Sequence, residues 1–321
     1  MVNTLTPPTF DRADVDSWKQ YLDTEGYAVI RDVLEKPAVH TGLEQFWKDW
    51  NTVSPGFVRT DPATWSIQTS PMMFAKGMAT FNGFGQSDFA WHLRTKQPII
   101  DIFANIHGTQ DLITSFDGFS VFFSKKQKSP KDWWHIDQHP NNPTYTVQGA
   151  YNFLPVTEES AGLTLVPRSH RTFVPSPTPV TKDWIQIHTN KTPEEAAVAI
   201  AGGVKLILPA NCFVLWNSKT IHANIGITPV NSRDKTDAGV LNRLTVYITY
   251  VPRSRRTSEA QLEQRKAAYK NGSTTSHWPN KVEVKTYPWG FGPAYEAKGF
   301  GRIAPRLDAD GEIPADRLKY I

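Results

Sequence analysis

The segment WHIDQ, residues 134–138, holds two side chains that can bind one cation. Alternate side chains of an extended strand share a face, so His135 and Asp137 point the same way. An imidazole and a carboxylate at this spacing reach a common ion, and a third ligand must come from elsewhere. His222 is the best candidate, because it lies 85 residues after Asp137 and follows an apolar segment, 212–216, that is typical of a strand.

Two histidines and one carboxylate leave several coordination positions of a metal ion open. This ligand set is typical of non-haem Fe(II) sites that activate dioxygen. Cys212 is the single cysteine of the chain, which argues against a structural zinc site and excludes an intrachain disulfide. Because a His-x-Asp pattern is weak by itself, a zinc-dependent hydrolase and a non-catalytic binding protein are kept as alternatives.

A second polar feature begins the apolar segment NRLTVYITY, residues 242–250. Strand alternation places Arg243, Thr245 and Tyr247 on one face and aliphatic side chains on the other. A buried guanidinium needs an anion, and its planar fork matches a carboxylate. Arg243 therefore either lines a pocket for a carboxylate or forms a salt bridge at the rim of the fold.

Composition places these residues in a soluble globular protein. The 321 residues are 39% hydrophobic and 21% charged, with 24 prolines and 11 tryptophans, a balance that favours short strands and turns over a helix bundle. The net charge of +4 comes from scattered residues, so we expect no nucleic-acid partner. No apolar run is long enough to span a membrane. We expect a cytoplasmic monomer with a small-molecule substrate.

The hydrophobic pattern divides one expected domain, 1–321, into three parts. Residues 1–115 are mostly helical, residues 116–252 alternate as strands, and residues 253–321 hold one helix (260–269) and an irregular aromatic segment. The expected strands are 117–124, 146–154, 162–166, 203–208, 212–216 and 243–251, and a further helix is expected at 193–200. This series predicts a mainly β fold with helical additions, closed or sandwiched.

Residues near the metal segment are candidates for substrate contacts. These are Trp134, Gln138, Tyr151 and Lys125, each of which could instead serve packing or the rim of the fold. Lysines at 125, 126, 128 and 131 favour a carboxylate-bearing substrate, or form a solvated loop. The aromatic C-terminal segment around His277 either packs in the core or closes over the site.

Several segments together resemble the phytanoyl-CoA dioxygenase family. Residues 21–34 look like the family's opening helix and strand, and residues 134–137 match its W-H-x-D metal segment. The stretch VTEESAGLTLVPRSHR, residues 156–171, is similar to a family motif in which Gly stands at the position of Arg168. His222 then matches the distal ligand. The similarity covers most of the chain in the family's order.

This resemblance implies a double-stranded β-helix (jelly roll, cupin-like) core that binds Fe(II), 2-oxoglutarate and O2. His135, Asp137 and His222 would hold the iron, and Arg243 the far carboxylate of 2-oxoglutarate, helped by Asn224 and Thr245. The reaction would oxidise an unactivated C–H bond of a small molecule, by hydroxylation, ring closure or desaturation, and release succinate and CO2. The chain departs from the family in that Arg243 follows His222 by 21 residues, a longer separation than usual.

Overall fold

Two six-stranded sheets form the centre of the computed structural model, which describes residues 2–66, 68–73, 77–123, 133–175, 182–227, 240–286 and 298–321. The first sheet has the order β1 (Asn3–Leu5), β10 (Val204–Leu206), β8 (Gly162–Leu165), β12 (His222–Ile225), β6 (His135–Ile136) and β9 (Ile185–Gln186). The second has the order β2 (Tyr27–Ile30), β11 (Cys212–Asn217), β7 (Val147–Asn152), β13 (Leu241–Ile248), β5 (Phe119–Phe123) and β3 (Met78–Ala79).

Eight of these strands pass back and forth between the sheets as the chain proceeds. Strands β5, β7, β11 and β13 lie in the second sheet, and β6, β8, β10 and β12 lie in the first. Their pairings are all antiparallel. This winding is that of a double-stranded β-helix, so the predicted fold class is confirmed.

The two faces of the second sheet bury different side chains. In β2, Tyr27 and Val29 point to the space between the sheets, whereas Ala28 and Ile30 belong to the larger core on the outer face. In β11, Val214 points inward in the same way. Burial of an aliphatic or aromatic side chain contributes about 1.5–3 kcal/mol, so both layers stabilise the two-sheet arrangement.

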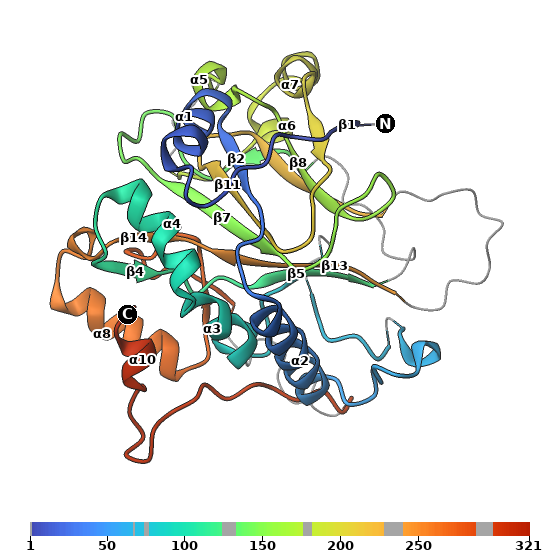
Figure 1. Cartoon of the computed structure of the whole chain (residues 1–321), viewed down its shortest axis with the longest axis vertical. Coiled ribbons are helices and arrows are strands. Elements are labelled where there is room, and N and C mark those ends of the chain that lie inside the picture. Colours follow the sequence, from blue (N-terminus) through green and yellow to red (C-terminus); the bar gives the residue numbers. More distant parts are fainter. Residues whose placement is uncertain are drawn as a thin grey trace.

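Helices cover the outer face of the second sheet, as Figure 1 shows for α2, α3 and α4. The helices are α1 (Val15–Glu25), α2 (Lys36–Val53), α3 (Asp88–Arg94), α4 (Gln97–His107), α5 (Ser169–Thr172), α6 (Ile187–Asn190), α7 (Pro193–Ile200), α8 (Glu259–Lys270) and α10 (Ala315–Leu318). Gly26 ends α1 with a left-handed φ of 83°, which glycine adopts without steric cost. Within the described ranges, no helix has the length and apolarity to cross a bilayer.

Short elements complete the chain. They are the 3-10 helices η1 (Pro62–Thr64), η2 (Phe84–Gln86) and η3 (Arg253–Arg255), the paired strands β4 (Leu112–Thr114) and β14 (Tyr250–Pro252), and the pair β15 (Thr274–Thr275) and β16 (Val284–Thr286). The expected strand 243–251 is thus two strands in different sheets. The mostly helical N-terminal part also supplies β1 and β2 to the two main sheets.

Candidate metal centre

Strand pairing brings the three predicted ligands together. Strands β6 and β12 are antiparallel neighbours in which His135 lies directly opposite His222, with ring centroids 4.3 Å apart. The Asp137 carboxylate reaches both rings: Oδ2 is 3.2 Å from His222 Nε2, and Oδ1 is 3.8 Å from His135 Nε2. One ligand atom from each of the three residues lies within 4.8 Å of the others, as a single bound ion requires.

Backbone carbonyls orient both imidazole rings. His135 Nδ1 is 2.8 Å from the Trp133 carbonyl oxygen, and His222 Nδ1 is 2.9 Å from the Thr220 carbonyl oxygen. A carbonyl oxygen only accepts, so each Nδ1 carries the proton and donates. Nε2 is therefore the ring nitrogen left to face Asp137 and a shared ion, the arrangement common in metal-binding histidines.

The carboxylate of Asp137 is held in its charged form. Burial by itself would raise the pKa of Asp137, but the nearby imidazoles of His277, His135 and His222 outweigh it and hold the pKa well below its usual range. Gln148 Nε2 also donates to Asp137 Oδ2 at 2.8 Å. Two imidazole nitrogens and a partly buried carboxylate facing one another form a donor set that fits a divalent metal ion.

Arg243 is buried between the two sheets with neutral partners. The residue is 3% exposed. Its Nη1 donates to the Gly162 carbonyl and to Asn224 Oδ1, both at 2.9 Å. Its Nε donates to Thr245 Oγ1 at 3.2 Å. Burial lowers the pKa of Arg243. Among the described residues no carboxylate pairs with it, so the site suits an anion from outside the chain.

A second buried cation, Lys205 on β10, lies near Arg243. Its Nζ donates to the Glu158 carbonyl at 2.8 Å and to the Ser160 carbonyl. Burial chiefly lowers the pKa of Lys205 to about 8, and the charge of Arg243 adds to this effect. Sequence patterns gave no signal for Lys205, because a single lysine in an apolar strand looks like an edge residue.

Asn224 and Thr245, which were predicted to help Arg243 bind 2-oxoglutarate, lie beside it and make hydrogen bonds within the protein. Asn224 accepts from Arg243 and donates from Nδ2 to Tyr247 Oη at 2.8 Å and to Ser120 Oγ at 3.0 Å. Thr245 accepts from Arg243 and donates to Asn152 Oδ1 at 2.6 Å. Thr245 therefore orients the guanidinium, while Asn224 also lines the cavity described next.

A cavity of about 810 Å³ opens beside the metal ligands, with His135, Asp137 and His222 in its wall. Its other walls come from distant parts of the chain. They include the C-terminal His277 and Trp278, both buried. These two residues of the aromatic C-terminal segment are thus packed in the interior and also form part of the cavity wall, whereas closure of the segment over the site stays a prediction.

Three of the four residues predicted to contact substrate lie away from this cavity. Trp134 packs with Ile136 in an apolar cluster behind the metal segment, and Gln138 donates to the carbonyl oxygens of Asn142 and Thr144. Tyr151 belongs to the outer core, and its hydroxyl donates to Asn211. A substrate role for them stays a prediction without support from the cavity wall.

Lys125, the fourth candidate, lies outside the described residues, as do the lysines at 126, 128 and 131. The alternation that puts His135 and Asp137 on one face also puts Trp133 there and Trp134 on the other. That signal was in the sequence, and Trp133 does line the cavity. Gln148, Tyr247 and Trp184, which also line it, come from segments whose approach to the metal segment depends on tertiary pairing.

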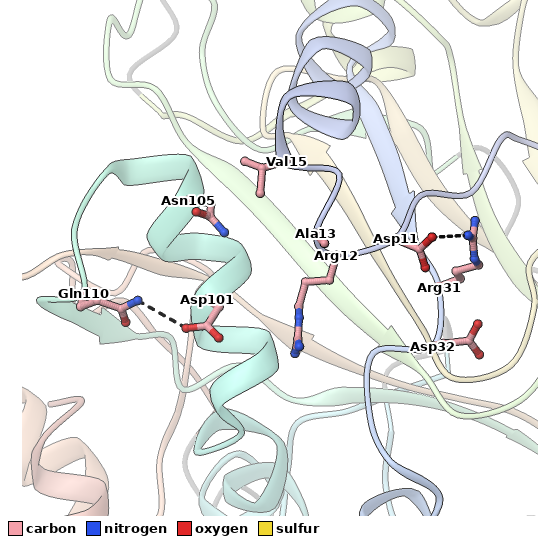
Figure 2. Close-up of a pocket in the computed structure, with 9 residues that line it drawn as sticks. All are labelled: Asp11, Arg12, Ala13, Val15, Arg31, Asp32, Asp101, Asn105 and Gln110. Atoms are coloured by element: carbon pink, nitrogen blue, oxygen red, sulfur yellow. Dashed lines mark hydrogen bonds and ion pairs between the residues drawn. The ribbon is translucent and has the colours of Figure 1, made fainter.

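Another hollow lies on the outside of the molecule, between α4 and the N-terminal segment (Figure 2). Arg31 pairs there with Asp11, and Gln110 donates to Asp101. Exposed polar groups that satisfy one another need no ligand. This surface hollow therefore serves as a contrast to the metal centre.

The chain is similar to several known proteins. No protein-family model matches the chain. The "Ava biosynthesis cluster protein O" of Aspergillus versicolor is 24% identical over 280 residues, 82% of this chain and 86% of that protein. The solved epimerase SnoN, in complex with Fe3+, alpha ketoglutarate and nogalamycin RO, is 19% identical over 75% of this chain and 84% of its own, with a TM-score of 0.48.

The structure of EctD from S. alaskensis with 2-oxoglutarate and 5-hydroxyectoine covers nearly the whole chain. It matches 96% of this chain and 91% of its own, with a TM-score of 0.50 and 16% identity. At this identity the likeness concerns the fold. The expected fold is confirmed by this likeness: the chain shares the fold of EctD, and it carries a His-Asp-His group suited to a metal ion.

Proposed function

We propose that the chain is an Fe(II)- and 2-oxoglutarate-dependent oxygenase that oxidises an unactivated C–H bond of a small molecule. The observation that carries this proposal is the convergence of His135, Asp137 and His222 on one point at the wall of a large cavity. Two imidazoles and one carboxylate with open coordination positions are the ligand set of iron oxygenases.

His135 and His222 would hold iron through Nε2, and Asp137 through its carboxylate. Iron bound there together with 2-oxoglutarate would supply the activation of dioxygen. A C–H bond of the substrate would be oxidised, and succinate and CO2 would be released. The residues of the chain have to bind and orient the substrate and to exclude water from the site. None of them is required as a general base.

Arg243 supplies positive charge between the two sheets for the far carboxylate of 2-oxoglutarate. Nη2 of Arg243 has no hydrogen-bond partner within the described part of the chain, so it can take up a carboxylate oxygen. Thr245 keeps the guanidinium in place, and Asn224 connects it to the cavity wall. A charge-assisted pair in this buried setting is stronger than one in solvent.

Anaerobic addition of Fe(II) and then 2-oxoglutarate tests the proposal. We expect a weak metal-to-ligand charge-transfer band in the visible, followed by succinate release when oxygen is admitted. Substitution Arg243→Met should preserve iron binding but raise the 2-oxoglutarate concentration needed for half-maximal absorbance by about 10–100-fold, the equivalent of a charged hydrogen bond. A protein that binds Zn(II) and hydrolyses esters without forming the band would instead be a hydrolase.

A further inference from the structure

Tryptophan is concentrated in the wall of the metal cavity. Four of the 20 residues that line it are tryptophans, Trp133, Trp184, Trp216 and Trp278, whereas the whole chain of 321 residues has 11. They come from four separate segments: before β6, before β9, within β11 and after β15. Their convergence is therefore a property of the cavity and not of one apolar strand.

Two of these indoles pack on the metal ligands. The Trp133 ring stacks on the His135 ring with centroids 4.6 Å apart and planes at 28°, and the Trp216 ring lies 5.4 Å from the His222 ring. Such contacts keep the imidazoles in place and shield them from water. They account for Trp133 and Trp216 without a substrate.

Trp184 also approaches a ligand ring, but this contact explains only part of its surface. It is 45% exposed, the largest of the exposed apolar side chains among the described residues, yet it lines the cavity and lies 5.9 Å from the His135 ring. An indole that a protein leaves half in solvent beside its reactive centre offers a flat surface for a ligand.

The backbone on both sides of Trp184 is fixed. Strand β9 follows directly and pairs with β6, with Ile185 opposite Ile136. Before it, the Asp183 carboxylate accepts hydrogen bonds from the His139 amide at 3.2 Å, from Asn142 Nδ2 at 2.9 Å and from Lys281 Nζ at 2.8 Å. A preorganised platform binds a ring with little loss of conformational entropy.

We propose that the substrate of this cavity carries a planar aromatic or heteroaromatic ring that stacks on Trp184 near the metal centre. This inference rests on the proposed function for the reaction that the ligand undergoes, but its argument for ring binding rests on the residues of the cavity wall. The ammonium group of Lys281 lies 4.4 Å from the Trp278 ring and pairs with Asp183. Lys281 is thus already engaged within the protein.

Two alcohols with the same carbon skeleton test the inference. 2-Naphthol is planar and aromatic, and decahydro-2-naphthol is its saturated counterpart. Binding is measured by calorimetry on the full chain, without iron and again with anaerobic Fe(II) and 2-oxoglutarate. We expect 2-naphthol to bind about tenfold more tightly, the size of one good ring contact with its buried area.

Variants of Trp184 identify the contact. Trp184→Leu should remove the preference for 2-naphthol, and Trp184→Phe should retain most of it. Trp65→Leu changes a partly buried tryptophan outside the cavity and should leave both affinities unchanged. Near-ultraviolet and far-ultraviolet circular dichroism of each variant shows that the protein is folded.

Equal affinity for the two alcohols, no binding of either at millimolar concentration, or an unchanged preference in Trp184→Leu would overturn the inference. These outcomes are separate from the proposed function. If the charge-transfer band is absent but the preference for 2-naphthol is found in the metal-free protein, the ring site stands and the oxygenase proposal fails. If the band forms without the preference, the oxygenase proposal stands alone.

Discussion

The two faces of β13 show how one strand serves stability and chemistry together. On the outer face Leu244 and Val246 lie in the large core beneath the helices. On the inner face Arg243 and Thr245, also buried, make hydrogen bonds to defined oxygen acceptors. The environments differ although the residues alternate along a single strand.

This difference indicates what each face requires of its residues. Apolar packing depends on volume, so a related side chain can replace another on the outer face. A buried polar group depends on particular partners, because leaving one partner unpaired costs more than the bond contributed. We therefore expect outer substitutions to change the free energy of unfolding, and inner substitutions to change ligand affinity.

The largest expected effect is the loss of the metal through Asp137→Ala. Loss of a residue that only hydrogen-bonds to a metal ligand lowers metal affinity by up to roughly 100-fold. Removing the charged ligand itself should lower Fe(II) affinity by more than this and should abolish the charge-transfer band. Iron titration monitored by absorbance measures both. Asp11→Ala, in the surface hollow of Figure 2, is the control; a variant of Asp137 that still binds iron normally would contradict the ligand assignment.

On the outer face, Leu244→Ala should lower the free energy of unfolding by about 2–5 kcal/mol, the range for a buried leucine that leaves a cavity. Urea denaturation followed by circular dichroism measures the change. Iron affinity of the folded variant should stay near that of the wild type. Leu318→Ala, at an exposed position, should change little. Loss of iron binding in folded Leu244→Ala would remove the distinction between the faces.

Gln148→Leu should act on the inner face without unfolding the chain. Gln148 donates to Asp137 Oδ2, so its loss frees the carboxylate to rotate and should weaken Fe(II) binding about tenfold, as for other residues that orient metal ligands. Gln148→Glu should not restore affinity, because it lacks the amide donor. Gln110→Leu in the surface hollow is the matched control. Unchanged iron affinity would show that β6 and β12 alone fix the carboxylate.

The smallest effect concerns Lys205 and pH. Its pKa in the folded chain is about 8, below the ordinary 10.5, so between these pH values the unfolded chain binds a proton that the folded chain has released. Stability from this group therefore rises with pH across that window. Between pH 7 and pH 10 the Tm of the wild type should therefore rise relative to the Tm of Lys205→Met. Lys36→Met, at an exposed position, should show no such trend.

Much of the fold and the ligand set could be predicted from the sequence because both depend on local alternation. The period of two predicts the strands that became β5, β7, β8 and β11 and puts His135 and Asp137 on one face. Residues that approach the site only through the pairing of distant strands leave no pattern in the local sequence. Gln148 reaches Asp137 from the other sheet, and Trp184 depends on the pairing of β9 with β6.

The pairing of β2 with β11 has a consequence for synthesis of the chain. Val29 lies opposite Val214, so a ribosome must add 185 residues before the early strand meets its neighbour. During that interval the four residues Tyr27–Ile30, all buried in the finished protein, have an unpaired edge of the kind that promotes association between nascent chains. Production at high rates should therefore favour inclusion bodies, and co-expressed chaperones that cover apolar segments should raise the yield of soluble material.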